Sequence, residues 1–189
     1  MGTYAKFCAE VRQNGQWHLN EKEVFPFPKD AWQREKGDGR EFWEYPFPSQ
    51  SYSLFGFLAG IRNYSETAVL SEPRGLPEDT SDDAVDLLAP HSTIGHAFDL
   101  YGTSDEEAKP MTVADRVHEG SGDNYGYSWL SLAELIGFDY DQTFTDQREE
   151  PPEVTTYRVF LGEGYFAHIE ALKRLGSPDD VRILFCFNG

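Results

Sequence analysis

The sequence predicts an α+β fold in a single domain that spans residues 1–189, and three observations carry this prediction. Alternating apolar and polar residues run from Thr3 to Val11 and lead to Asn14-Gly15, a dipeptide typical of tight hairpin turns. Apolar residues between Ser51 and Arg62 recur at the spacing of one helical face. Residues 155–187 combine strand-like, helix-like and strand-like patterns, which favours a mixed architecture.

The N-terminal half is expected to hold the hairpin, two extended segments and two helices. Proline at alternate positions in Phe25-Pro26-Phe27-Pro28 and Tyr45-Pro46-Phe47-Pro48 excludes helix and central strand, so these segments are predicted to lay their rings over the core. The first helix is predicted over residues 51–62. A second, acidic helix is predicted to end at Leu88, and Thr80-Ser81-Asp82-Asp83 resembles a capping box at its start.

The C-terminal half begins with a Gly-, Asp- and Ser-rich stretch that predicts long irregular structure over residues 90–127, weakly helical only near 111–117. Ser131 and Glu134 form the pattern of a capping box before a brief helix. The remaining elements are predicted as strand 138–141, strand 155–161, helix 165–175 and strand 181–187. Together with the hairpin, this ending predicts a mixed or antiparallel sheet with helices mainly on one face and long irregular loops.

The charge balance excludes some functions. Asp and Glu number 33 against 16 Lys and Arg, a formal charge of −17, so phosphate backbones are repelled and no direct nucleic-acid binding is expected. No run of 18 apolar residues occurs and the first residues lack a secretory pattern, so we expect no membrane association and a cytoplasmic location. Cys8 and Cys186 lie in strand-like stretches and are expected to be buried, reduced thiols.

Several histidines raise the question of a metal site. His91, His96, His118 and Asp123 offer imidazole and carboxylate ligands of the kind that zinc or manganese prefers. Their spacing does not place two histidines on one helical turn, so solvated loop histidines are the alternative. His168, beside the apolar face of the last predicted helix, is expected to be a partly buried structural residue. Phosphate-binding and hydrolase motifs are absent from the sequence, and no cofactor is expected.

A small set of cationic and aromatic residues is the candidate ligand site. Arg62 and Arg74 stand isolated in an acidic chain, and Tyr127 and Trp129 offer rings that can stack on a base. Asn63, directly after Arg62, completes the set. The two arginines either pair internally with carboxylates or mark a pocket for an anion.

Four stretches resemble an uncharacterised family found in bacteriophages and actinobacteria: 54–63, 71–79, 128–135 and 181–187. Members of that family begin Met-Gly-x-Asp-Ile-His and carry His-Ser-His-Ser-Trp-Leu in the middle. This chain has Tyr4-Ala5-Lys6 and Tyr125-Gly126-Tyr127-Ser128-Trp129 at those places, so candidate metal ligands are missing at both. The resemblance implies a phage origin, a place in the host cytoplasm, and antagonism of a host system.

Three functions follow as expectations. The first is a non-catalytic protein that sequesters a small anionic or nucleotide-like ligand, or a host defence factor. The alternative is an acidic interaction protein that imitates a nucleic acid toward a basic host protein, and the third is a metal-dependent hydrolase that uses the histidines named above. A homo-oligomer is compatible with each of them. The acid that would serve the second function lies at Glu78, Asp79, Asp82, Asp83 and Asp86, and at Glu149, Glu150 and Glu153.

Overall fold

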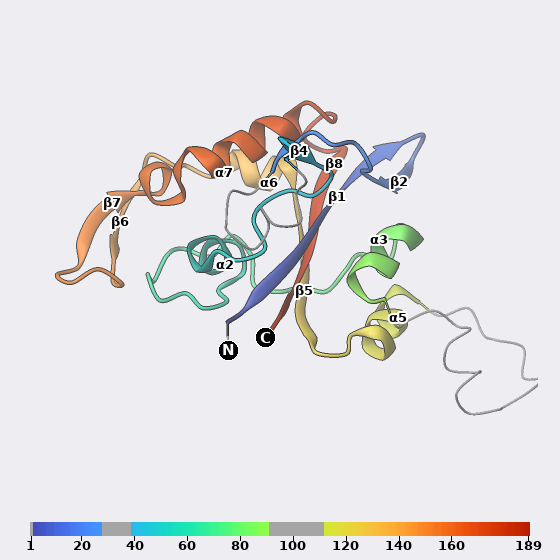
Figure 1. Ribbon diagram of the computed structural model, residues 1–189, viewed down its shortest axis with the longest axis horizontal. Coiled ribbons are helices and arrows are strands. Elements are labelled where there is room, and N and C mark those ends of the chain that lie inside the picture. The colour runs from blue at the N-terminus through green and yellow to red at the C-terminus, as the bar shows by residue number, and fades with distance from the viewer. Residues whose placement is uncertain (1, 28–38, 91–111) are drawn as a thin grey trace, which may run out of the picture.

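A four-stranded antiparallel sheet lies at the centre of the computed structural model, which describes residues 2–27, 39–90 and 112–189 (Figure 1). The strand order is β2-β1-β8-β5. With helices packed on the sheet, the predicted α+β fold is confirmed, and the sheet is antiparallel. The strands are β1 (Tyr4–Gln13), β2 (Gln16–Leu19), β5 (Asn124–Ser131) and β8 (Val181–Asn188).

The predicted hairpin is confirmed, and its turn fixes the register of the sheet edge. Asn14 and Gly15 have φ angles of 52° and 79°, the left-handed pair that a tight two-residue hairpin turn requires. β2 is short and pairs only with residues 10–13 of β1. The first half of β1 therefore has an edge that β2 does not cover, and there the amide of Ala5 donates to the carbonyl of Ser49 at 2.7 Å.

Helices lie on both faces of the sheet (Figure 1). The larger group packs on the face of Phe7 and Phe185, and the smaller group on the face of Cys8 and Cys186. The first group is α2 (Tyr52–Ala59), α6 (Leu132–Gly137) and α7 (Tyr157–Lys173), and the second is α3 (Asp82–Leu88) and α5 (Val113–Gly120). Most of the helical residues thus lie on one face, as predicted.

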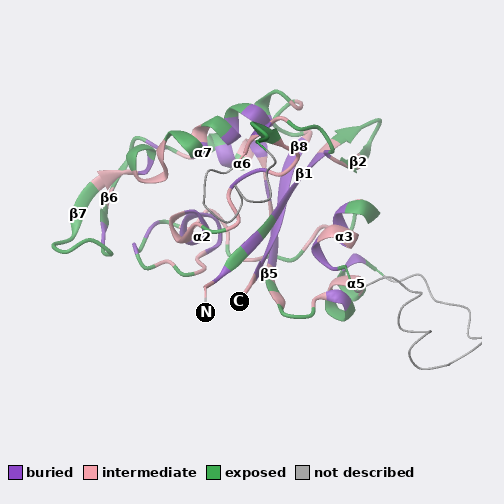
Figure 2. Ribbon diagram, viewed as in Figure 1, coloured by how far each residue is buried: buried purple, intermediate pink, exposed green. Residues whose placement is uncertain are grey.

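The larger core is mainly aromatic. β8 is buried from Val181 to Phe187, and β1 is buried over its middle, from Phe7 to Glu10 (Figure 2). Phe47 is 1 % exposed, and its ring lies 5.6 Å from that of Phe7 and 5.4 Å from that of Tyr165. Phe25 is fully buried. The prediction that the proline-rich segments lay rings over the core is therefore confirmed for the described residues; Pro28 lies outside them.

Two helices are capped by neighbouring residues, as the sequence predicts, and a third is capped in part by a residue from a distant strand. Ser51 caps α2, and Ser131 with Glu134 forms the predicted capping box of α6. At α3 the predicted capping box is wrong, because Ala84 occupies the third helical position. Glu10 of β1 takes the missing role and accepts from the amide of Ser81 at 2.8 Å.

Three predictions for the C-terminal half are wrong. Residues 138–141 form a turn instead of a strand, and the strand predicted over 155–161 stops early. β7 (Glu153–Thr156) ends where the Thr156 hydroxyl caps the start of α7, so the following apolar residues are helical. β7 pairs with β6 (Thr143–Asp146) in a separate two-stranded sheet, so the expected β-α-β unit is absent from these residues.

β5 lies partly inside the stretch that was predicted to be irregular. A register shift between Tyr125 and Ser128 interrupts its pairing with β8, and Gly126 has a φ of 61°. This bulge breaks the apolar alternation that identifies a strand from sequence. A further two-stranded sheet joins β3 (Phe25–Pro26) to β4 (Phe42–Trp43).

The two cysteines are buried and unpaired, as expected. Burial raises the pKa of Cys8 well above its ordinary value and that of Cys186 to about 12. A thiol with so high a pKa is a poor nucleophile. Within the described ranges, no helix has the length and apolar character needed to cross a membrane.

Candidate functional site

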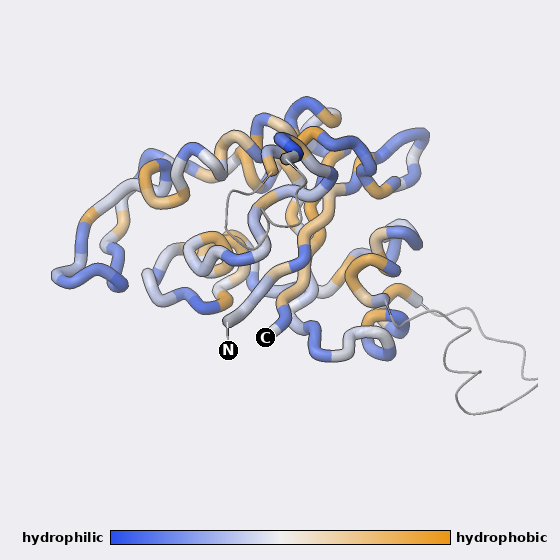
Figure 3. The backbone as a smooth tube through the Cα atoms, in the orientation of Figure 1, coloured by the Kyte–Doolittle hydropathy of each residue, from blue (hydrophilic) through white to orange (hydrophobic). Residues whose placement is uncertain are grey.

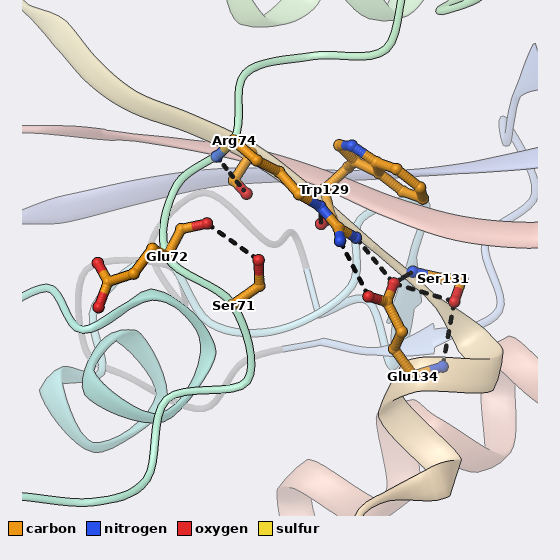
Figure 4. Close-up of polar contacts among 7 residues, drawn as sticks. Ser71, Glu72, Arg74, Trp129, Ser131 and Glu134 are labelled. Carbon is orange, nitrogen blue, oxygen red and sulfur yellow. Dashed lines mark hydrogen bonds and ion pairs between the residues drawn. The ribbon is translucent and has the colours of Figure 1, made fainter.

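Arg74 and Trp129, two of the predicted ligand residues, lie together (Figure 4). The guanidinium of Arg74 stacks on the Trp129 ring at 3.9 Å, and its Nε donates to the Trp129 carbonyl at 3.1 Å. Its two terminal nitrogens donate to the two carboxylate oxygens of Glu134 at 3.0 and 2.8 Å. The donors of Arg74 are therefore directed to groups of the protein itself.

The Glu134 carboxylate is the centre of this arrangement. It also accepts from the amide and the hydroxyl of Ser131, at 2.8 and 3.0 Å. Burial raises the pKa of Glu134, but the hydrogen bonds from Arg74 and Ser131 outweigh it and hold that pKa below its ordinary value. The ion pair thus fastens the turn that carries Arg74 to the start of α6.

Arg74 belongs to an alternating stack of cationic and aromatic side chains on the sheet. Arg182 lies 3.9 Å from the Trp17 ring and 5.9 Å from the Trp129 ring, and Arg12 lies 5.4 Å from Trp17. The order is Arg12, Trp17, Arg182, Trp129, Arg74, and we call these five residues the arginine–tryptophan ladder. Such stacking is attractive because each cation meets the negative face of a ring.

Arg182 is the buried centre of the ladder, with its side chain 3 % exposed. Its Nε donates to Glu10 at 2.7 Å, and another nitrogen donates to Asp79 at 2.8 Å. The indole of Trp17 donates to the same Asp79 carboxylate at 3.0 Å. Glu10 is fully buried, so this ion pair is satisfied inside the protein and offers no site to a ligand.

Arg62 and Asn63, two other residues of the predicted ligand site, bond to groups near the start of β1 and in the following turn. Exposed Arg62 donates to the Thr3 hydroxyl and to the Tyr64 hydroxyl, at 3.0 and 3.1 Å. Asn63 closes a turn, because its side chain both accepts from and donates to the backbone of Thr67.

Tyr127 is buried on the α3 side of the sheet and donates to the Leu88 carbonyl at 3.1 Å. Burial raises its pKa to about 12. The structure therefore packs Tyr127 into the same core cluster that Trp129 borders, while the contacts of Arg62 and Asn63 belong to the start of β1 and the 63–67 turn.

The proposed metal ligands are placed only in part. His91 and His96 lie outside the described residues, whereas His118 and Asp123 are both exposed. In the part of the chain that the structure describes, no group of three or more His, Cys, Asp or Glu residues is arranged to hold a metal ion.

A cavity of about 420 Å³ lies at the open edge of β1, and we call it the edge cavity. Ala5 and Ala9 direct backbone groups to this edge, where they bond to Ser49 and Asn20. Phe7 stands midway between them, so its N–H and C=O face the same edge, and no backbone partner for them occurs among the described residues. The lining residues are Ala5, Lys6, Phe7, Phe27, Arg40, Trp43, Glu44, Tyr45, Pro46, Phe47, Ser49 and Leu87.

Rings form the walls of the edge cavity. The Trp43 ring meets those of Phe27 and Tyr45 edge to face, at 4.9 and 5.4 Å. Their mutual packing fixes the rings before any ligand binds, which lowers the entropic cost of binding.

The charged groups of the edge cavity are two cations and one carboxylate: Lys6, Arg40 and Glu44. Lys6 makes no ion pair with any described residue, and Arg40 reaches Glu23 only at 3.6 Å between two half-exposed side chains. Exposed pairs of this kind contribute little. Within the part of the chain that the structure describes, Lys6 and Arg40 therefore keep donors that no carboxylate holds closely, whereas the donors of Arg74 and Arg182 are bonded to Glu134, Glu10 and Asp79.

Comparisons with known protein families, curated proteins and solved structures gave no match. The resemblance to the phage and actinobacterial family stays a prediction. Sequence reasoning did not select Lys6 as a candidate, because the residues of β1 that face an open edge are known only once the end of β2 is known.

Proposed function

We propose that this protein is a non-catalytic binding protein that holds a small anionic ring compound of the nucleotide type in the edge cavity. One observation carries the proposal. Lys6 and Arg40 line the same cavity as the packed rings of Trp43 and Tyr45, and among the described residues the ion pair of these cations is the loose one from Arg40 to Glu23. The cavity lies at a strand edge where the backbone of Phe7 has no backbone partner among the described residues. Rings and cations around one cavity of a few hundred Å³ are what a ring with an anionic group requires.

Each part of such a ligand has a partner in the cavity. A planar ring can pack on the indole of Trp43 or the phenol of Tyr45, as bases do on aromatic side chains. A ring edge that carries a donor and an acceptor can pair with the N–H and C=O of Phe7. The anionic group then lies between Lys6 and Arg40.

The acidic surface sets the size of the ligand. The lining carries two cations and one carboxylate, a local sum of +1, in a chain of formal charge −17. At physiological salt, charges further than about 8 Å apart are largely screened, so a small anion is governed by the local cations. A long polyanion meets the acidic surface around the cavity and is repelled.

The residues that line the edge cavity favour binding of a ligand without catalysis. Among the described residues that line the edge cavity there is no histidine or cysteine, and the thiols of Cys8 and Cys186 are buried elsewhere. If the chain is phage-encoded, as the family resemblance implies, a nucleotide-like signal of host defence is the kind of ligand that such a protein removes.

Thermal-shift titrations with AMP and with cyclic dinucleotides test the proposal. We expect at least one of these anions to raise the melting temperature, and Lys6→Gln to weaken its binding about tenfold, the loss of one charge-assisted hydrogen bond. Lys173→Gln is the matched control, since Lys173 is an exposed lysine whose ion pair is with Glu170. The proposal fails if none of these nucleotides stabilises the protein, or if the two lysine variants weaken binding equally.

An acidic interaction protein is the second candidate, and the β6–β7 arm favours it. Figures 1 and 3 show this hairpin projecting from the body with a hydrophilic tip. Its glutamates at 149, 150 and 153 are exposed and form no ion pair within the described residues. In contrast, Asp82 and Asp86 of α3 both pair with Arg116, at 2.6 Å each.

The arm and α3 can be compared directly by capture of basic host proteins. One variant changes the three arm glutamates to glutamine, and its control changes Asp82, Asp83 and Asp86 to asparagine. We expect salt-sensitive partners to be lost from the arm variant and kept by the control. Equal capture by the two variants would remove this candidate.

A further inference from the structure

A second cavity, of about 660 Å³, lies between the entry of α2 and the middle of α7. It shares the rings of Phe27 and Phe47 with the edge cavity, and we call it the helix cavity. The cap and first turn of α2 line it with Ser51, Ser53 and Leu54. The lining residues from α7 are Phe160, Leu161, Glu163, Gly164, Tyr165, Ala167 and His168. The volume is typical of small-molecule sites.

His168 is the buried polar residue of the helix cavity, with 5 % of its surface exposed. Its Nδ1 accepts from the amide of Phe47 at 3.1 Å. Burial lowers the pKa of His168 to about 4, so at neutral pH the ring is uncharged and its one proton sits on Nε2. No described residue accepts a hydrogen bond from Nε2, which leaves a fixed donor at the cavity.

The ring of His168 is held firmly. It stacks on Phe25 at 6.0 Å and packs on Phe47 at 5.3 Å. Phe47 has a φ of 64°, a left-handed conformation that is costly for a residue other than glycine. The bond from its amide to His168 helps to keep this backbone in place, so histidine and cavity wall are positioned together.

A break in α7 adds backbone donors to the same wall. Gly162 has φ 74° and ψ 170°, so regular helix starts again at Glu163. The first amides of a helix have no acceptor within that helix. A side-chain carbon placed at Gly164 would meet nothing within 4 Å, so the backbone here borders open space.

The charges distinguish the helix cavity from the edge cavity. Its described lining contains no lysine or arginine, and its one formal charge is the exposed carboxylate of Glu163. An anion therefore meets repulsion here without a compensating cation. The N–H groups of His168 and of the first residues after the break in α7 fit an acceptor atom on a neutral ligand. The rings of Phe47, Phe160 and Tyr165 fit an apolar part of the same ligand.

We propose that the helix cavity is a binding site for a neutral, ring-bearing amide or ketone, whose carbonyl oxygen accepts from Nε2 of His168. The ring of the ligand packs against Phe47 and Tyr165. This site does not depend on the ligand proposed for the edge cavity.

Titration of the 15N-labelled full chain with benzamide and with benzoate, followed by NMR, tests the assignment. The two probes have the same shape and differ in charge. We expect benzamide to shift the His168 imidazole and Gly164 amide signals with a Kd of about 1–10 mM, the range for a ligand of this size. Benzoate should bind this cavity at least about fivefold more weakly.

Two results on the unmodified protein would overturn the proposal. One is that benzamide at about 20 mM leaves the His168 and Gly164 signals in place, well above the expected Kd. The other is that benzoate binds the helix cavity as tightly as benzamide. His168→Asn keeps an acceptor for Phe47 but loses the Nε2 donor, and we expect it to weaken benzamide about fivefold or more. His18→Asn makes the same change at an exposed histidine that does not line the helix cavity, and this matched control should leave benzamide affinity unchanged.

Discussion

The arginine–tryptophan ladder and the edge cavity place the same kinds of side chain side by side and use them differently. In the ladder, the Arg182 guanidinium lies between indole rings and donates to Glu10 and Asp79. In the edge cavity, Lys6 and Arg40 line the same space as the Trp43 ring, and among the described residues their ion pair is the loose one between Arg40 and Glu23. A cation beside a tryptophan therefore indicates a binding site only where no carboxylate already occupies its donors.

The difference also separates stability from binding. A buried, fully bonded ion pair becomes costly when one partner is removed, because the other charge stays buried. A cation at an open cavity is solvated with or without a ligand, so its loss costs the fold little. Substitutions in the ladder should therefore lower stability and leave binding intact, and substitutions in the edge cavity should do the reverse.

The largest expected effect is at the buried centre of the ladder. Glu10→Ala leaves Arg182 without its buried partner and should lower the free energy of unfolding by about 3–5 kcal/mol. Urea denaturation measures the loss. Glu170→Ala, at an exposed pair, should change stability by less than about 1 kcal/mol. A loss below 1 kcal/mol for Glu10→Ala would mean that the ladder does not hold the sheet together.

The next effect concerns pH and contrasts the ladder with His168. The pKa of His168 is about 4 in the folded protein against an ordinary 6.5, so the unfolded chain binds a proton that the folded one does not between these values. Stability should therefore fall as pH is lowered from 7 to 5, by about 2 kcal/mol.

Asp79, which pairs with Arg182 of the ladder, should not contribute to that fall. Burial raises the pKa of Asp79, but hydrogen bonds from Arg182 and Trp17 outweigh it and hold the pKa below 3.8, so Asp79 stays ionised at pH 5. His168→Asn should accordingly flatten the pH profile of the unfolding free energy between pH 7 and 5. An unchanged slope in that variant would assign the pH dependence to other groups.

A smaller effect is expected at the exposed end of the ladder. Arg74→Gln removes the ion pair to Glu134 and the stacking on Trp129, both partly exposed, and should cost about 1 kcal/mol in thermal or urea unfolding. Glu134→Gln should cost a similar amount, since both changes break one ion pair. A loss above 3 kcal/mol for either would show that this pair is as essential as the buried one.

The smallest effect on stability is expected in the edge cavity. Lys6→Gln removes an exposed cation that has no ion pair among the described residues, so the unfolding free energy should change by less than about 0.5 kcal/mol. Circular dichroism through a urea titration suffices to measure it. A larger loss would reveal a structural role and weaken the case for Lys6 as a binding residue.

Local signals made much of the fold predictable. The Asn14-Gly15 turn and the Ser51 and Ser131 caps are read from a few adjacent residues, and each is confirmed. β5 was not predicted, because its bulge at Gly126 disrupts the alternation of apolar and polar residues. The carboxylate that helps to cap α3 was not predicted, because it belongs to Glu10 of β1, far away in the sequence.

The contacts of the candidate site join residues that are still further apart in the sequence. Sequence analysis placed Arg74 and Trp129 in one candidate site. The carboxylate that accepts from Arg74 belongs to Glu134, 60 positions further along the chain. Arg182 and Glu10 face each other across β8 and β1, 172 positions apart in the sequence. Such pairings follow from strand register, which a single sequence does not specify, and they decide which cations remain free for a ligand.

Calorimetric titration of AMP into the unmodified protein, Lys6→Gln and Arg74→Gln tests most directly whether Lys6 of the edge cavity, and not Arg74 of the ladder, binds the anion. We predict that Lys6→Gln weakens AMP binding about tenfold or more and that Arg74→Gln leaves it within about twofold. The opposite pattern, with affinity lost at Arg74 and kept at Lys6, would contradict the account.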